Sequence, residues 1–199
     1  MCGLWHAAGV LADAVLAQQS EDGLHRVYAP KVIGARALQI VSVVANLCSC
    51  MLFSAVAGLL GGAGPANYSA ANACLDALAA WRRVNSTTSA SVQWGAWAEL
   101  GMAARGAASE RMAAMEAASG FARGIGLAQG LAALHVAVLP GAVPCIGVFP
   151  VQWHRMLGGG TAPAFLNAMV HRSSGGAPLA TIQQTAFAVS LDAMLEMVR

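Results

Sequence analysis

Residues 48–84, CSCMLFSAVAGLLGGAGPANYSAANACLDALAAWRRV, carry the pattern that decides the fold. Residues 48–58 are an apolar run that ends in glycine, which is typical of a strand buried on both faces. Pro65 then marks a helix start, and apolar residues follow it at spacings of three and four. This order predicts a buried strand followed by a helix, which is the unit from which parallel sheets are built.

The same alternation continues on both sides of this stretch. Residues 2–9 (CGLWHAAG) form a short apolar run, and residues 20–41 show mixed helical spacing. Residues 90–97 (ASVQWGAW) and 143–151 (VPCIGVFPV) predict two later strands, with two helices expected in residues 109–137. We therefore expect an α/β fold with a Rossmann-like, doubly wound parallel sheet between two helical layers, in which ligands bind at the carboxyl ends of the strands.

The strand and helix pattern weakens after Pro150. GGGTAP (158–163) and RSSGGAP (172–178) are rich in glycine, serine and proline, as linkers are. The sequence predicts one domain over residues 1–157, followed by a linker and the start of another region over residues 158–199.

Composition excludes several classes of function. The formal net charge is only +2, so the chain lacks the basic surface that nucleic acid requires. The five cysteines show no CxxC pairing and the five histidines are scattered, which argues against a metal site and against a disulfide framework. Residues 1–16 lack the basic start of a signal peptide. These features indicate a protein of a reducing, cytoplasmic compartment.

Residues 41–64 offer a competing interpretation, because they are uncharged over a length that could cross a bilayer. Asn46, three serines and a glycine-rich end weaken that signal, and a buried strand gives the same apolar run. We expect no membrane contact. The membrane alternative predicts dependence on detergent.

Tyr68 and Lys31 are the first candidates for chemistry. A tyrosine on the first turn of a helix at the mouth of a sheet can transfer a proton if a nearby cation lowers its pKa. Lys31 lies in the apolar segment APKVIG, an unusual place for a solvated charge. Residue spacing alone leaves open a half-buried core tyrosine and a surface lysine whose stem lies along apolar surface.

A resemblance connects these residues. HAAGVLADAVL (6–16), APKVIGARAL (29–38), residues 52–83 and ASVQWGAWAELGMA (90–103) resemble, in order, blocks of the ketoreductase domain of modular polyketide synthases. That domain belongs to the short-chain dehydrogenase/reductase family. The resemblance implies NADPH as cofactor and reduction of the β-keto group of a chain bound to an acyl carrier protein.

The resemblance also assigns roles to single residues. Tyr68 would be the proton donor, and Lys31 the cation that lowers its pKa and holds the nicotinamide ribose. Asn72 would keep the lysine in place, since this subfamily has Tyr-x-x-x-Asn. A tyrosine beside an ammonium group can neutralise the oxyanion that develops as hydride reaches a carbonyl carbon.

One member of the family site is missing. The serine that orients the substrate lies thirteen residues before the tyrosine in the family, and Ala55 occupies that place here. Ser54 is adjacent, but neighbouring strand residues point to opposite faces, so it could substitute only after a one-residue slip. The loss of one donor to an oxyanion typically costs about 10²- to 10³-fold in rate, so we expect impaired activity.

The resemblance marks further residues near the cofactor and the substrate. Asp13 is what remains of a Leu-Asp-Asp motif that marks one stereochemical class, and Leu60 stands where the other class has tryptophan. The expected cofactor-binding residues are Ala7, Ala8, Gly9, Lys31, Tyr68, Gly95, Ala96 and Trp97, and the expected substrate-facing residues are Asp13, Leu60 and Met102.

The glycine-rich turn that binds the dinucleotide phosphates in the family has no counterpart here, because the sequence begins near the family's fourth strand. We therefore expect association with an N-terminal half of the domain, with neighbouring synthase domains, or with itself through an exposed strand edge. Two functions stay open: an impaired ketoreductase of a polyketide or fatty acid synthase, and a catalytically silent structural domain of such a synthase.

Overall fold

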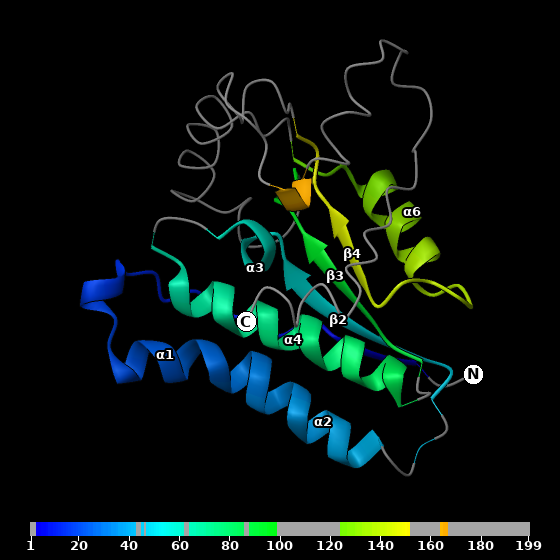
Figure 1. The fold of residues 1–199 in the computed structure, drawn as a ribbon, viewed down its shortest axis with the longest axis horizontal. Helices are drawn as coiled ribbons and strands as arrows, with labels where there is room; N and C mark the ends of the chain where they lie inside the picture. Colours follow the sequence, from blue (N-terminus) through cyan, green and yellow to red (C-terminus); the bar gives the residue numbers. More distant parts are fainter. Residues whose placement is uncertain are drawn as a thin grey trace. The chain divides into compact units, whose positions relative to one another are not determined.

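The structure is a computed structural model of the 199-residue chain, and it describes residues 3–42, 45, 47–61, 64–85, 88–98, 124–151 and 164–166. Figure 1 shows the arrangement of the elements. In chain order they are β1 (Gly3–His6), η1 (Leu16–Gln18), α1 (Glu21–Tyr28), η2 (Ala29–Ile33), α2 (Gly34–Ser42), β2 (Ser49–Ala55), α3 (Ala57–Leu60), α4 (Ala66–Val84), β3 (Ala90–Trp94), α6 (Leu127–Ala137), β4 (Cys145–Val148) and η4 (Ala164–Leu166).

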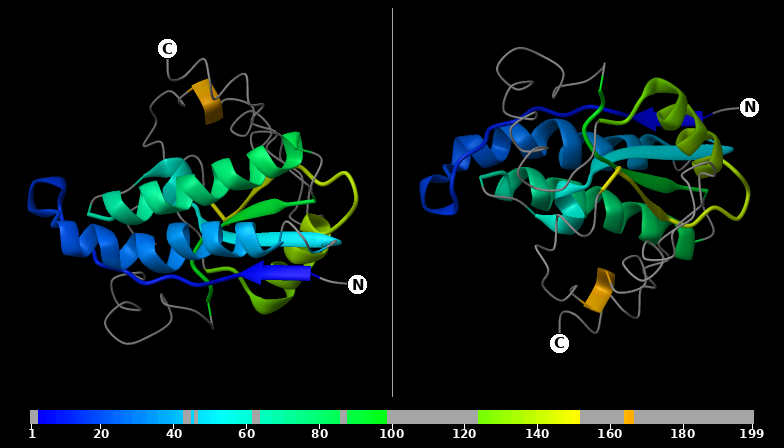
Figure 2. Two further views of the ribbon diagram at one scale, coloured as in Figure 1. Left: turned by 90° about the horizontal axis from the view of Figure 1, so that it is seen from below. Right: turned by 90° about the horizontal axis from the view of Figure 1, so that it is seen from above.

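The four strands form one parallel sheet in the order β1-β2-β3-β4. Helices α1, α2 and α4 lie on one face of this sheet, and α6 lies on the other, as the two views of Figure 2 show. The predicted α/β fold with helices on both faces is confirmed. The described strands follow one another across the sheet in chain order, as the strands on one side of a doubly wound sheet do.

The alternation of side chains along β2 divides the interior into two regions. Cys50 and Leu52 face α2 and α4, where they form a buried cluster with Ala35, Leu75 and Ala79. This apolar cluster explains why the apolar positions of α4 recur at helical spacing. The odd-numbered residues of β2, including Phe53, face the other way.

Phe53 is the centre of an aromatic row on that second face. Its ring centroid lies 6.2 Å from that of Trp5 on β1 and 5.7 Å from that of Trp94 on β3. The register explains the row, because Trp5 is paired with Met51 and Trp94 with Ala55, so these side chains stand on the same side of the sheet. Trp5 is 50% exposed.

Between α1 and α2 the helix widens into a π turn, η2, which contains Lys31. Pro30 explains the change, because proline has no backbone N–H to donate to the preceding turn. Single π turns inside helices are frequent at functional sites. The segment that sequence analysis singled out for its lysine is therefore also where the helical hydrogen bonding changes.

Residues 41–64, the alternative membrane segment, contain the end of α2, the strand β2 and the short helix α3. Within the described residues, no helix combines the length and the apolarity that a membrane span requires. The apolar run of residues 48–58 is thus the strand that the sequence predicts, extended at its end by α3.

The chain divides into two compact units. The described part of the first lies within Met1–Gly95 and Ala128–Val148, and that of the second within Ala96–Leu127 and Phe149–Ala186. In the second unit, Trp97 pairs with Ile125 in an isolated parallel bridge. The predicted boundary between residues 157 and 158 lies outside the described residues.

Candidate active site

Three elements of the first unit position the candidate catalytic residues. Helix α4 carries Tyr68 and Asn72 one turn apart near its start, and β2 ends at Ala55 beside that start. Lys31 comes from η2, which contacts α4. The structure therefore brings together the residues that sequence analysis selected from three distant segments.

Lys31 is the only lysine of the sequence, and its side chain is buried. Its Nζ donates a hydrogen bond to the backbone oxygen of Phe53 at 3.0 Å and lies 5.2 Å from the ring centroid of Tyr68. Burial lowers the pKa of Lys31 to about 8, while the charge of Asp76 acts in the opposite direction. The ammonium form still predominates at pH 7, by about ten to one.

Gly9 closes the site on the β1 side. A Cβ added at Gly9 would lie 3.0 Å from Cε of Lys31 and 3.4 Å from its Nζ. A larger residue at this position would therefore displace the lysine. Ala7 and Ala8, which precede Gly9 after β1, are exposed.

Tyr68 is partly buried, and burial raises its pKa above the usual value. The side chain of Asn72 acts in the opposite direction, and the charge of Asp13 raises the pKa further. Sequence analysis expected a lowered pKa from Lys31, but the net direction in the structure is upward because desolvation of the phenolate dominates. Tyr68 therefore holds its proton at neutral pH.

Asn72 is completely buried on α4. Its Nδ2 donates to the backbone oxygen of Tyr68 at 2.8 Å, whereas its Oδ1 has no hydrogen-bond partner among the described residues. A buried acceptor without a partner normally costs free energy, about 1–3 kcal/mol. The site thus contains an acceptor that a ligand, a water molecule or a moved side chain can satisfy.

The pairing of β2 with β3 shows how the backbone runs at Ala55, the position of the family's serine, and at its neighbour Ser54. The pairing of β2 with β3 continues without interruption through Ser54, paired with Gln93, and Ala55, paired with Trp94. Ser54 faces α4, and its Oγ donates to the backbone oxygen of Asn72 at 3.2 Å. The pairing shows no one-residue slip, and Ser54 as a substitute for the serine stays a prediction.

The segment after β1 lies against the start of α4. Nδ2 of Asn67 donates to the backbone oxygen of Ala12 at 2.8 Å, and the backbone N–H of Ala14 donates to Gly64 at 3.0 Å. These contacts hold Asp13, which is exposed, close enough to influence the pKa of Tyr68. The candidate substrate residue Leu60 is half-buried at the end of α3, which packs on α4.

The remaining candidates lie at the end of β3 and beyond it. The backbone N–H of Gly95 donates to Val148 at 2.8 Å, within the first unit. Ala96 and Trp97 belong to the second unit, where the oxygen of Ala96 accepts from the N–H of Ile125 at 2.7 Å. Met102 lies outside the described residues.

Sequence analysis missed three buried polar residues around this site. His6 Nε2 lies 3.0 Å from the backbone oxygen of Lys31, and burial lowers the pKa of His6, which favours the neutral ring. Asn67 anchors the segment after β1, and Asp76 binds β3 from α4. The sequence could have indicated Asp76, because it is an acidic residue within the apolar stretch CLDALAA (74–80) of a predicted helix.

Gly9 lies against the buried side chain of Lys31, and Lys31 lies at the face of the Tyr68 ring, one helical turn before Asn72 with its unpartnered Oδ1. Within the described ranges, no group of three histidine, cysteine or acidic residues could hold a metal ion.

A parallel α/β sheet with a tyrosine, a lysine and an asparagine gathered at the carboxyl end of its strands defines a Rossmann-type fold with polar residues where such sheets bind ligands. Comparison with known families identifies the family to which the chain belongs. Residues 1–99 match the family described as KR domain. The chain belongs to the ketoreductase domains of polyketide synthases, within the short-chain dehydrogenase/reductase superfamily.

Individual relatives agree with this assignment. The chain is 41% identical over 168 residues to polyketide synthase GfsB of Streptomyces halstedii, covering 80% of this chain and 3% of that protein. It is 44% identical over 102 residues to 6-methylsalicylic acid synthase of Aspergillus terreus, covering 51% of this chain and 6% of the relative. The chain thus spans only a few per cent of the length of these synthases.

Solved ketoreductases share the fold. The first ketoreductase of the tylosin synthase matches with a TM-score of 0.69 and 35% identity, over 78% of this chain and 33% of that structure. The ketoreductase from the first module of phoslactomycin biosynthesis in a Streptomyces strain matches with a TM-score of 0.69 and 33% identity, over 81% and 37%. The chain spans about a third of each solved domain.

Proposed function

We propose that this chain supplies the catalytic part of an NADPH-dependent ketoreductase domain, which reduces a β-ketoacyl chain carried by an acyl carrier protein of a polyketide or fatty acid synthase. The observation that carries the proposal is the convergence of Tyr68, Lys31 and Asn72 at the end of β2 and the start of α4. We place the protein in the cytoplasm, where its free cysteines stay reduced.

In this proposal, NADPH supplies the hydride to the carbonyl carbon. Tyr68 donates its proton to the carbonyl oxygen, and its raised pKa keeps that proton in place until charge develops on the oxygen. Lys31 provides a buried positive charge at the face of the Tyr68 ring, which stabilises the phenolate that remains. Asn72 offers its free Oδ1 to the polar groups of this site.

The cofactor would lie along Ala7, Ala8 and Gly9, with Lys31 and Tyr68 at its nicotinamide end. Gly95, Ala96 and Trp97 are proposed as further contacts of the nicotinamide, and Asp13, Leu60 and Met102 as substrate contacts. The outer edge of β1 is unpaired among the described strands. We propose that an N-terminal half of the domain, or a neighbouring synthase domain, binds there and contributes the phosphate-binding turn.

A catalytically silent structural domain is the second candidate. The observation that favours it is the orientation of Ser54, whose buried hydroxyl serves Asn72 and leaves the neighbouring position without a donor. The two candidates share the fold and differ only in turnover.

The test measures NADPH binding and β-ketothioester reduction by the full chain, alone and together with a supplied N-terminal ketoreductase half. With that half present, we expect weak reduction, an increase of about 10²-fold in Ala55→Ser, and loss in Tyr68→Phe. Ala70→Ser, the same change at an exposed position of α4, is the control and should leave the rate unchanged. Absence of both binding and turnover in every combination would establish the structural domain instead.

A further inference from the structure

Asp76 lies on α4, one turn after Asn72 and two turns after Tyr68. It is 3% exposed and is the only buried acidic residue in the part of the chain that the structure describes. Buried carboxylates are rare unless they are paired or hydrogen-bonded. Its position directly below the candidate active site therefore requires an explanation.

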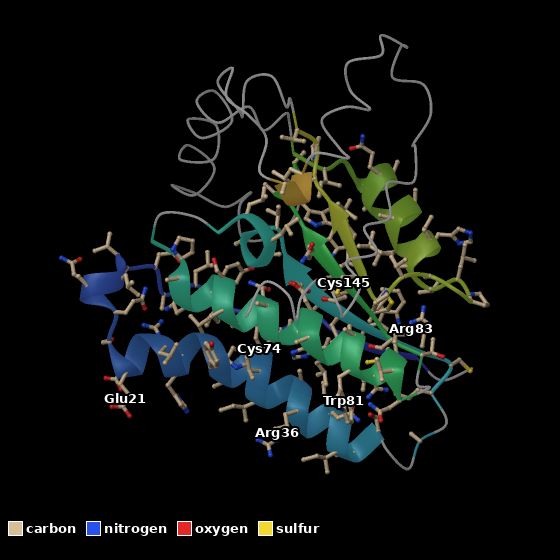
Figure 3. All side chains as sticks on the ribbon, in the orientation of Figure 1. Glu21, Arg36, Cys74, Trp81, Arg83 and Cys145 are labelled. Atoms are coloured by element: carbon tan, nitrogen blue, oxygen red, sulfur yellow. The ribbon has the colours of Figure 1, made fainter. Side chains whose placement is uncertain are left out.

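Both carboxylate oxygens of Asp76 accept hydrogen bonds from side chains of β3. Ser91 Oγ donates to Oδ1 at 2.6 Å, and Gln93 Nε2 donates to Oδ2 at 2.8 Å. Cys145, labelled in Figure 3, adds a contact from β4, with its Sγ 3.5 Å from the backbone oxygen of Asp76. One turn earlier, Ser54 joins α4 to β2. The helix is thus attached to three strands just below its catalytic residues.

Helix α3 encloses the same carboxylate from another side. A Cβ added at Gly58 would lie 3.3 Å from Oδ2 of Asp76 and 3.3 Å from Cβ of Asn72. Glycine at this position lets α3 approach α4 closely. The carboxylate is therefore shut off from solvent by the sheet and by α3.

The charges of Asp76 and Lys31 act on each other across this interior. Each favours the charged form of the other, against the burial that disfavours both. Three other titratable groups lie around the pair, besides the exposed Asp13, whose charge acts on Tyr68. They are His6 on β1, whose pKa is lowered, and Tyr68 on α4 and Cys145 on β4, whose pKa values are raised.

We propose that Asp76 is a positioning residue of the ketoreductase site: it fixes α4 to β3 through Ser91 and Gln93, and it balances the buried charge of Lys31. This inference rests on the proposed function, in which Lys31 is the cation beside Tyr68. Its second part concerns only the ionisation of Lys31. It can therefore be tested without cofactor or substrate.

The single lysine makes the test direct. In the full chain labelled with [¹³C]lysine, one side-chain NMR signal reports the titration of Lys31, and its midpoint in the wild type is expected near pH 8. Asp76→Asn keeps the shape and removes the charge, so the midpoint should fall by about one pH unit, a tenfold change in the dissociation constant. Asp22→Asn, the same change at an exposed position of α1, should leave the midpoint unchanged.

An unchanged midpoint in Asp76→Asn would overturn the proposal and leave Asp76 as a purely structural residue. If Asp76→Asn does not fold, Lys31→Met combined with Asp76→Asn decides the question, because that variant removes both charges. Recovery of a cooperative unfolding transition supports the pairing, and failure to recover rejects it. Since neither readout involves reduction, an inactive protein with a shifted Lys31 midpoint would contradict the proposed function and not this inference.

Discussion

On the face of the sheet that α4 covers, Cys50 and Leu52 pack against Leu75 and Ala79. On the same face, Ser54 donates a hydrogen bond to the backbone oxygen of Asn72, and Ser91 donates one to Asp76. On the opposite face, Trp5 is half exposed at the outer edge of β1, beside Phe53. Tyr68, Asn72 and Lys31 come from elements that lie on the first face. The difference indicates that the described residues complete the packing under the site, whereas Trp5 at the edge of the described sheet keeps half of its surface exposed.

The largest expected difference in stability is between two leucine variants, one on each face of the sheet. Leu75→Ala leaves a cavity in the cluster under α4 and should lower the free energy of unfolding by about 2–5 kcal/mol. Leu131→Ala, on α6, removes a side chain that is 56% exposed and should cost less than about 0.5 kcal/mol. Urea denaturation of both variants measures the contrast. Equal losses would show that the two faces are packed alike.

Asn67→Ala tests the polar attachment at the start of α4. The change removes hydrogen bonds to Ala12 and Gly23 and an acceptor for the N–H of Tyr68, at a buried position. We expect a loss of about 1–3 kcal/mol and faster amide hydrogen exchange in residues 10–15.

Asn85→Ala is the matched control, because its exposed amide makes a hydrogen bond to Trp81 at the other end of the helix. It should cost about 0.5 kcal/mol. If the two substitutions had the same effect, Asn67 would be an ordinary helix-end residue.

The buried lysine predicts a pH dependence of stability. The pKa of Lys31 is lowered in the folded chain to about 8 from 10.5, so between these values the unfolded chain binds more protons. The free energy of unfolding therefore rises with pH in this window, and the full cost of burying the ammonium is present below pH 8. Relative to Lys31→Met, the wild type should gain about 1 kcal/mol between pH 7.5 and 9.

Urea unfolding at several pH values measures this gain. The raised pKa of Cys145 destabilises the fold at alkaline pH, but it does so in both proteins and cancels in the difference. A constant difference between wild type and variant would mean that Lys31 is solvated.

The smallest expected change in stability belongs to the aromatic residue at the open edge. Trp5→Ser should alter the free energy of unfolding by about 0.5 kcal/mol or less and should reduce self-association, measured by sedimentation velocity. Trp81→Ser is the control, because that side chain is 54% exposed on the outside of α4, as labelled in Figure 3. Dissociation caused by Trp81→Ser alone would place the contact surface on α4 instead.

Most of the fold could be predicted from local pattern. The apolar run that became β2 and the helical spacing from Pro65 onwards predict the central strand and helix correctly, because burial imposes period and length on a sequence. The candidate site was selected by its resemblance to a family, and the structure brings its main residues together. Asn67 and Asp76 were missed, because an amide or an acid has no characteristic period and its partners lie far away in the sequence.

The sequence by itself determined the order of strands and helices, the single lysine and the alanine at position 55. Only the tertiary structure decided that Ser54 turns toward Asn72, that Lys31 is buried against Tyr68, and that Asp76 binds two residues of β3. The reason is physical. Period and composition follow from local burial, whereas a hydrogen bond, a pKa and the direction of a side chain depend on groups that meet only after the chain has folded.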